Sequence, residues 1–162
     1  MRSNPRGLVL IIANNLYEKF KDRRPSAKHD AENIKKLFEE MGFRVIAHYD
    51  LTGEVFLFIP NLLFTKKFII LNLLSLMLQE IIKRVKEFSE MPELRRVDSA
   101  FVIISSHGSG KLGHQETEIL GIDYNSTGYK TVVCTTIMNY FTAENCRNLL
   151  GKPKIFIFQT CR

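Results

Sequence analysis

The run KIFIFQTCR, residues 154–162, decides how the rest of the chain is interpreted. It follows Gly151-Lys152-Pro153, which stops a helix, and its aromatic and branched residues predict a buried strand of a parallel sheet. Open α/β sheets place their ligands at the carboxyl ends of such strands. Cys161 follows the predicted strand and therefore stands where a reactive group is expected.

A second strongly apolar run ends in a similar way. Residues 99–105 read SAFVIIS, and Ser106, His107 and Gly108 come next. If the two strands are neighbours, the imidazole of His107 and the thiol of Cys161 face one crevice. An imidazole that takes the thiol proton holds the thiolate, which is the actual nucleophile.

These two ends carry a family resemblance. Ser106-His107-Gly108 and Gln159-Thr160-Cys161-Arg162 resemble the two active-site motifs of the caspase family of cysteine endopeptidases. Threonine stands at the alanine position of the second motif, and its final glycine is absent because the sequence stops at Arg162. The resemblance extends from about Arg6 to the end and implies that His107 and Cys161 are catalytic. It also implies that the backbone N–H groups of Gly108 and Cys161 bind the developing oxyanion.

The resemblance further implies a substrate. In the family, an arginine shortly before the first helix lines the pocket for a substrate aspartate, and Arg24 matches it, with Arg23 as the fallback. Composition alone would describe this stretch as a solvated basic loop, and Ser26 replaces a usual glycine. Arg24 and Gln159 are therefore expected to bind substrate: the guanidinium binds a carboxylate in bidentate fashion, and the amide adds a neutral donor.

The order of elements predicts an α/β fold, a three-layer sandwich with a mostly parallel central sheet flanked by helices. The large subunit of the caspase family has that fold. Hydrophobic periodicity and turn residues give the expected elements: strands at 7–13, 43–48, 99–105 and 154–158, helices at 28–41 and 136–150, a further helix that contains Ile81 and ends near Met91, and a surface hairpin at 119–123 and 129–133.

Residues 55–79 interrupt this pattern with a mostly apolar stretch. A transmembrane helix is disfavoured because Pro60 and Lys66-Lys67 divide the stretch into two short apolar runs. A membrane-surface or partner-binding hairpin is a second interpretation. The favoured interpretation is translated intron, because valine codons begin with GT, glutamine can be encoded by CAG, and AT-rich DNA yields this composition. We therefore expect residues 55–79 to lie outside the native fold.

Removing the stretch restores a helix start. Glu54 then adjoins Glu80, and Thr52 becomes an N-cap with Glu80 three positions on, which is the capping-box spacing. Ile81, Val85 and Phe88 form the apolar stripe of the helix that follows.

Composition excludes several other classes. The net charge of +6 is scattered, without an arginine-rich arm or zinc-finger spacing, which argues against nucleic acid. Cys134 and Cys146 are expected to be packing residues of a protein from a reducing compartment, and a cytoplasmic location without membrane attachment follows. No metal or cofactor is expected, and His48 and His114 are interpreted as ordinary surface histidines.

Two functions remain open from the sequence. The first is the large p20 subunit of a caspase-like endopeptidase that cleaves after aspartate, in apoptosis or a related proteolytic pathway. The second is a catalytically silent homologue that regulates or dimerises with a full-length caspase. Because the sequence ends just after Cys161, we expect the domain 1–162 to be incomplete, to need the small subunit and a dimer, and to have little activity alone.

Overall fold

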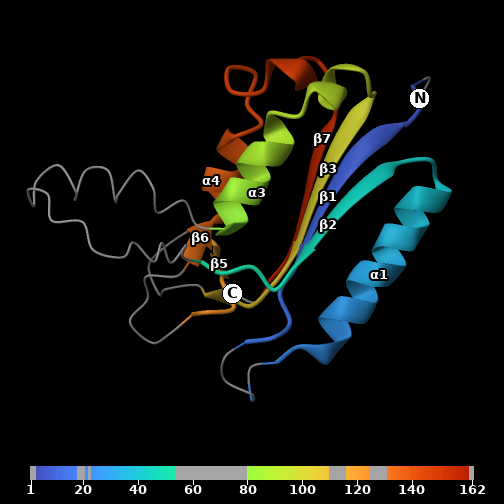
Figure 1. The fold of residues 1–162 in the computed structure, drawn as a ribbon. Helices are drawn as coiled ribbons and strands as arrows, with labels where there is room; N and C mark the ends of the chain where they lie inside the picture. The colour runs from blue at the N-terminus through green and yellow to red at the C-terminus, as the bar shows by residue number, and fades with distance from the viewer. Residues whose placement is uncertain are drawn as a thin grey trace, which may run out of the picture.

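The centre of the molecule is a four-stranded, wholly parallel sheet in the order β2-β1-β3-β7 (Figure 1). The structure is a computed structural model that describes residues 3–17, 21, 23–53, 80–109, 116–124 and 131–160. The parallel sheet expected from the sequence is confirmed, with these bounds: β1 Gly7–Ala13, β2 Arg44–Tyr49, β3 Ser99–Ser105 and β7 Lys154–Gln159. The burial predicted for the last strand is wrong: no residue of β7 is buried, because among the described strands it pairs on one side only.

The strand neighbours match the sequence expectation. All seven residues of β1 are buried, as its unbroken apolar run predicts for a central strand. Strands β3 and β7 lie side by side, with Ser105 opposite Gln159. The carboxyl ends of these two strands therefore meet at one edge of the sheet.

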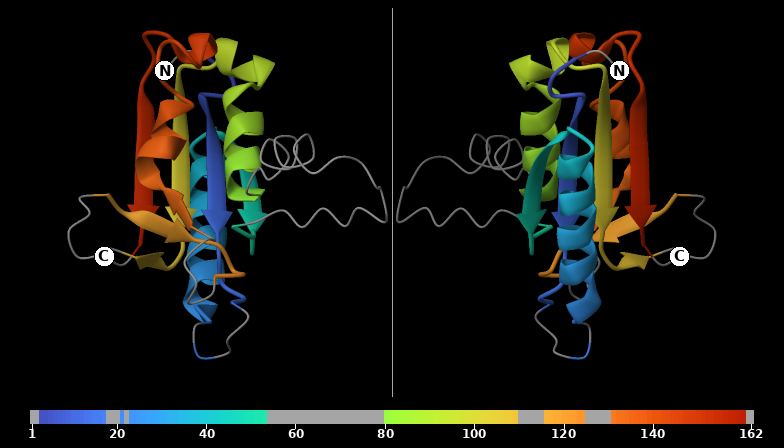
Figure 2. Two further views of the ribbon diagram at one scale, coloured as in Figure 1. Left: turned by 90° about the vertical axis from the view of Figure 1, so that its left-hand side faces the viewer. Right: turned by 90° about the vertical axis from the view of Figure 1, so that its right-hand side faces the viewer.

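Helices cover both faces of the sheet, which gives three layers. Helix α1 (Pro25–Glu40) lies on one face, and α3 (Glu80–Ser89) and α4 (Cys134–Asn139) lie on the other (Figures 1 and 2). The sheet contributes side chains to two hydrophobic cores, one on each face, because successive side chains of β3 point to opposite faces. Val102 and Ile104 join the core under α3, whereas Ile103 joins the core under α1.

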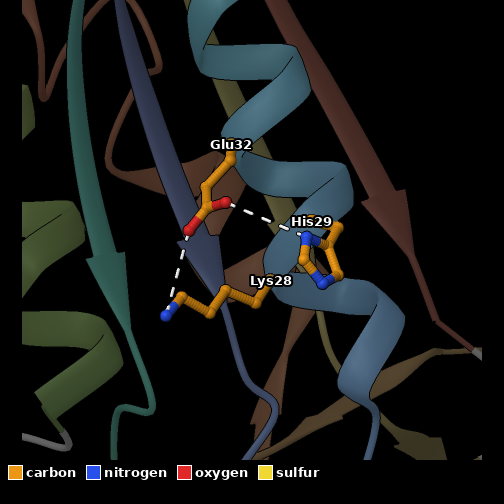
Figure 3. A network of polar contacts seen from close by, with 3 residues as sticks. All are labelled: Lys28, His29 and Glu32. Atoms are coloured by element: carbon orange, nitrogen blue, oxygen red, sulfur yellow. Dashed lines mark ion pairs between the residues drawn. The ribbon is translucent and has the colours of Figure 1, made fainter.

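Helix α1 begins at Pro25, three residues earlier than the sequence indicated. Proline suits the first helical turn because its missing N–H would have no partner there. Arg24 is therefore the residue that caps the helix rather than part of a long loop. On the outward face, the side chains of Lys28 and His29 both point toward Glu32, at 3.9 and 4.0 Å (Figure 3). These exposed contacts add little stability.

The third predicted helix, 136–150, is wrong in its length. Helix α4 ends at Asn139, and only a short 3₁₀ turn, η3 (Arg147–Leu149), follows. The side chains of Thr142 and Asn145 both donate hydrogen bonds to the carbonyl of Asn139, at 3.3 and 2.8 Å. Such local bonds compete with helical ones and end the helix. Leu150, expected to point mostly inward, is 65% exposed.

A small antiparallel sheet lies near the carboxyl ends of the strands of the main sheet (Figure 2). The predicted hairpin is confirmed as β5 (Glu118–Leu120) paired with β6 (Thr131–Val133). Strand β4 (Gly108–Ser109) adds a third strand that the sequence did not indicate. The hairpin is not purely a surface feature, because Ile119 is fully buried in the main core.

The remaining segments fit between these elements. Ile81, Val85 and Phe88 are buried on α3, as predicted, and the charged connection after it contains the 3₁₀ turn η2 (Pro92–Arg95). Residues 55–79 and His114 lie outside the described residues. Among the residues that are described, none forms a helix that is both apolar enough and long enough to cross a membrane.

Candidate active site

Two consecutive serines at the end of β3 organise the candidate site. Ser105 is the last residue of the strand and Ser106 follows it, and both are buried. The backbone N–H of Ser106 donates to the carbonyl of Gln159 at 3.2 Å, which continues the pairing with β7 past the strand end. Because side chains alternate along an extended chain, the two hydroxyls serve opposite faces of the sheet.

The Ser106 hydroxyl belongs to a chain of hydrogen bonds that starts at His107. The backbone N–H of His107 donates to the Tyr17 hydroxyl at 2.8 Å, and Ser106 Oγ donates to the Leu120 carbonyl at 2.6 Å. The Tyr17 and Ser106 oxygens are 2.7 Å apart. Since the single proton of Ser106 is used on Leu120, Tyr17 must donate to Ser106. The Leu120 N–H donates back to the His107 carbonyl at 2.9 Å and closes a ring.

The aromatic ring of Tyr17 also contacts the imidazole. The two ring centroids are 4.6 Å apart with a 54° tilt between the planes. Tyr17 is only 4% exposed, and this burial raises the pKa of its phenol above the usual value. Tyr17 therefore remains an uncharged donor, and it holds the half-buried His107 through both its backbone and its ring.

Asn14, which directly follows β1, is hydrogen-bonded to the same network. It is fully buried, its Nδ2 donates to the carbonyls of Leu51 and Leu120, and its Oδ1 accepts from the Leu51 N–H at 3.0 Å. Asn14 Nδ2 also reaches Ser106 Oγ at 3.4 Å. We call Asn14, Tyr17, Ser106, His107 and Leu120 the histidine network.

The Ser105 hydroxyl connects the two residues expected to bind substrate. Arg24 Nη1 donates to Ser105 Oγ at 3.2 Å, and Ser105 Oγ donates to Gln159 Oε1 at 2.9 Å. Arg24 is half-buried and Gln159 is exposed, so both side chains remain accessible. Arg23, the fallback in the sequence, is exposed. We call Arg24, Ser105 and Gln159 the recognition triad.

The other expected site residues are only partly described. Gly108 is half-buried and opens β4, directly after His107. Cys161 lies outside the described residues, so its pairing with His107 and the oxyanion role of the two backbone N–H groups stay predictions. In the part of the chain that the structure describes, no group of three or more His, Cys, Asp or Glu side chains could hold a metal ion.

Sequence reasoning missed the residues that hold the expected ones in place. Tyr17 and Asn14 had no signal in the sequence, because their roles depend on contacts across many residues. Ser105 did have a signal in the sequence. It lies two residues before His107, just as Gln159 lies two residues before Cys161, and this equal spacing places Ser105 opposite Gln159 in a parallel pair. His48 was interpreted as a surface residue but is half-buried, and burial lowers its pKa, with Arg84 adding to the effect.

Comparison with known proteins identifies the family. The Caspase domain family matches residues 6–162. The chain is 30% identical to Caspase-1-B of Xenopus laevis, over 99% of this chain and 35% of that protein. It is 34% identical to Caspase-1 of Mus musculus, over 96% of this chain and 31% of that protein, and 28% identical to Caspase-2 of Gallus gallus, over 99% and 30%. The chain spans about a third of the length of these relatives, and it belongs to the caspase domain family.

Proposed function

We propose that the chain is the large-subunit part of a cysteine endopeptidase that hydrolyses peptide bonds after aspartate. The observation that carries this proposal is the recognition triad, which brings Arg24 and Gln159 to one hydroxyl at the carboxyl ends of β3 and β7. His107 follows Ser105 by two residues, at the same carboxyl end of β3. Membership of the caspase domain family supports the same reaction class.

In the proposed mechanism, Cys161 is the nucleophile and His107 manages protons. The Cys161 sulfur forms a bond to the substrate carbonyl carbon, and the backbone N–H groups of Gly108 and Cys161 bind the resulting oxyanion. The C–N bond then breaks, and the amine leaves with a proton from His107. Water hydrolyses the thioester, releases the acid product and restores the thiol. The histidine network supports these steps, because it fixes the backbone and the ring of His107.

The proposed aspartate specificity rests on charge and geometry. The guanidinium of Arg24 presents five N–H donors, of which the Ser105 hydroxyl uses one. The remaining donors suit a carboxylate, which accepts bidentate bonds. Gln159 contributes its amide N–H groups from the neighbouring strand.

We further propose that a small subunit covers the β7 side of the sheet, and that the complete enzyme is a dimer. In the described part of the chain β7 pairs on one side only, and Ile157 on it is 45% exposed. A mostly apolar cavity of about 490 Å³ lies between α1 and this side of the sheet, lined by Ile34, Ile103 and Ile157 among others. An apolar face beside an unpaired strand favours a further polypeptide.

We also propose that residues 55–79 are not needed by the fold. The backbone N–H of Thr52 donates to Glu80 Oε2 at 3.2 Å, which is the return contact of a capping box, and the Thr52 hydroxyl donates to the same oxygen at 3.2 Å. The Gly53 N–H donates to Asp123 Oδ1 at 2.6 Å. Both described borders of the segment are therefore held by the folded domain, and Thr52 and Glu80 already touch.

The physiological setting is proposed from the cysteines and from the family. Cys134 and Cys146 are free thiols, and Cys146 packs with its Sγ 3.2 Å from the Ser89 carbonyl. Free thiols suit a reducing, cytoplasmic compartment. A role in apoptosis or a related proteolytic pathway is proposed from the family alone.

Covalent labelling tests the enzymatic proposal. The chain is incubated with a peptide chloromethyl ketone that ends in aspartate, and with the matched peptide that ends in asparagine. The Cys161 sulfur displaces chloride, and mass spectrometry of the digested chain locates the adduct. We expect the aspartate reagent to label Cys161 at least about tenfold faster, since a hydrogen bond between charged groups contributes roughly 1.5–3 kcal/mol. His107→Asn should slow the labelling, and Cys161→Ala should abolish it.

Iodoacetamide is the control for the intrinsic reactivity of the thiol. Equal labelling by the two peptide reagents would contradict aspartate specificity. If Cys161 reacts with iodoacetamide but with neither peptide reagent, and adding a caspase small subunit does not restore the labelling, the result favours the alternative function, a silent homologue that regulates or dimerises with a full-length caspase.

A further inference from the structure

The Ser105 hydroxyl contacts both Arg24 and Gln159, the two side chains proposed to bind the substrate aspartate. It is 7% exposed and sits at the last position of β3, directly opposite Gln159 of β7. Its oxygen accepts from Arg24 Nη1 at 3.2 Å and donates to Gln159 Oε1 at 2.9 Å. Arg24 and Gln159 come from separate elements, the cap of α1 and the end of β7, and Ser105 bonds to both.

One of these two directions is fixed by chemistry and the other by the placement of the Gln159 amide. A guanidinium can only donate, so a lone pair of Ser105 Oγ must face Arg24. The structure places the amide oxygen of Gln159, rather than its nitrogen, at Ser105 Oγ, and this oxygen accepts the hydroxyl proton. The amide NH₂ of Gln159 consequently points away from Ser105 and stays available as a donor.

We propose that Ser105 is a positioning residue that sets the specificity of this site for a carboxylate side chain. It acts by holding Arg24 in place and by orienting the Gln159 amide so that NH₂, not oxygen, is presented to the substrate. An amide turned the other way would present its oxygen, which repels a carboxylate and accepts from an asparagine amide. The inference rests on the proposed aspartate recognition by Arg24 and Gln159 and adds the residue that makes it selective.

The surroundings allow a conservative test. Ser105 lines the cavity of about 490 Å³ between α1 and the sheet, so Ser105→Thr can place its extra methyl group there while keeping the hydroxyl. Ser99, at the other end of β3, gives a matched control. It is also a fully buried serine, and its hydroxyl has no hydrogen-bond partner among the residues that the structure describes. Ser99→Ala therefore makes the same chemical change on the same strand, far from the site.

The experiment measures binding of small probes to the full chain by NMR. The probes are the N-methylamides of N-acetylaspartate and N-acetylasparagine, and the signals are the side-chain N–H groups of Arg24 and Gln159. We expect the wild-type chain to bind the aspartate probe about tenfold more tightly than the asparagine probe, as expected for a charge-assisted pair. Ser105→Ala should lose most of that preference, Ser105→Thr should retain it, and Ser99→Ala should match the wild type.

The outcomes distinguish the role of the Ser105 hydroxyl from the proposed aspartate recognition by Arg24 and Gln159. If the wild type prefers aspartate and Ser105→Ala does so equally, or if Ser105→Thr behaves like Ser105→Ala, the role of the Ser105 hydroxyl is overturned while Arg24 and Gln159 keep theirs. If the wild type itself shows no preference for aspartate, the proposed recognition is overturned together with this inference.

Discussion

Ser105 and Ser106 are adjacent in the chain, yet their hydroxyls work in different surroundings. Ser106 Oγ faces buried partners, Tyr17 and the carbonyl of Leu120, within the histidine network. Ser105 Oγ faces one half-buried and one exposed side chain, Arg24 and Gln159, within the recognition triad. Strand alternation alone separates the two sets by sending neighbouring side chains to opposite faces.

The difference indicates which polar residues stabilise the fold and which are available for the proposed substrate recognition. The side chains of Asn14, Tyr17 and Ser106 in the histidine network are buried, so each of these polar groups depends on the others. The recognition triad opens to solvent, where a lost bond can be replaced by water. We therefore expect changes in the histidine network to reduce the free energy of unfolding, and changes in the recognition triad to alter ligand preference with little loss of stability.

The largest effect is expected from Asn14→Ala. The substitution leaves the Leu51 N–H and two carbonyls with fewer partners in a fully buried place. Several unsatisfied buried groups predict a loss of about 3–4 kcal/mol in the free energy of unfolding. Urea denaturation measures it, with Arg24→Ala as the comparison from the recognition triad, expected to cost less than about 1 kcal/mol. Equal losses in the two variants would remove the distinction between the two sets.

Tyr17→Phe tests the hydroxyl that joins His107 to Ser106. The variant keeps the ring beside the imidazole but leaves the His107 N–H without its acceptor. We expect a loss of about 1–2 kcal/mol in the free energy of unfolding and slower labelling of Cys161 by the aspartate reagent. Labelling by that reagent at the wild-type rate would show that Tyr17 stabilises the fold without positioning His107.

The same variant should change the response to alkaline pH. Because burial raises the pKa of Tyr17 in the folded chain, its contribution to stability is present below the ordinary tyrosine pKa of 10.0 and is lost as pH rises through the folded value. The wild type should therefore lose more stability than Tyr17→Phe above that range. Parallel unfolding curves for the two chains from neutral to alkaline pH would contradict this expectation.

Arg24→Lys should change recognition alone. Lysine keeps the positive charge but lacks the planar fork that bonds both Ser105 and a carboxylate. We expect most of the roughly tenfold preference for the aspartate probe to be lost, while the free energy of unfolding changes by no more than about 0.5 kcal/mol. NMR titration measures the preference and urea denaturation measures the free energy of unfolding. An unchanged preference would show that the Arg24 guanidinium does not determine the selectivity for aspartate.

The smallest effect is expected from deleting residues 55–79. Neither the histidine network nor the recognition triad includes the segment, and Thr52 and Glu80 already touch. Probe preference and labelling should match those of the full chain, and the melting temperature should be equal or higher. A deletion variant that fails to fold would show that the segment belongs to the domain, and sequencing of the spliced transcript checks the same point independently.

Much of the fold could be predicted because its signals are local. The apolar runs that became β1 and β3 are long and uninterrupted, the run of β7 is shorter but rich in aromatic and branched residues, and the stripe of Ile81, Val85 and Phe88 defined α3. The last predicted helix failed because Thr142 and Asn145 bond to the backbone of Asn139, and hydrophobic spacing does not register that competition.

The sequence predicted only the motif residues of the candidate site, and their roles stay predictions. His107 came from its place after a strand and from family resemblance, Arg24 and Gln159 came from the resemblance, and the structure connects Arg24 with Gln159 through Ser105. Tyr17 could not be predicted, because its hydroxyl meets a backbone N–H ninety residues away. A contact of that kind depends on the packed fold, and no spacing along the chain indicates it.

The central claim, that His107 activates Cys161 in one cleft, is tested most directly by the alkylation rates of the three cysteines. Burial raises the pKa of the Cys134 and Cys146 thiols, so both serve as slow internal references on the same chain. We predict that iodoacetamide at pH 7 modifies Cys161 at least about tenfold faster than either, and that His107→Asn removes most of this advantage. A Cys161 that reacts no faster than Cys134, at a rate that His107→Asn leaves unchanged, would contradict the account.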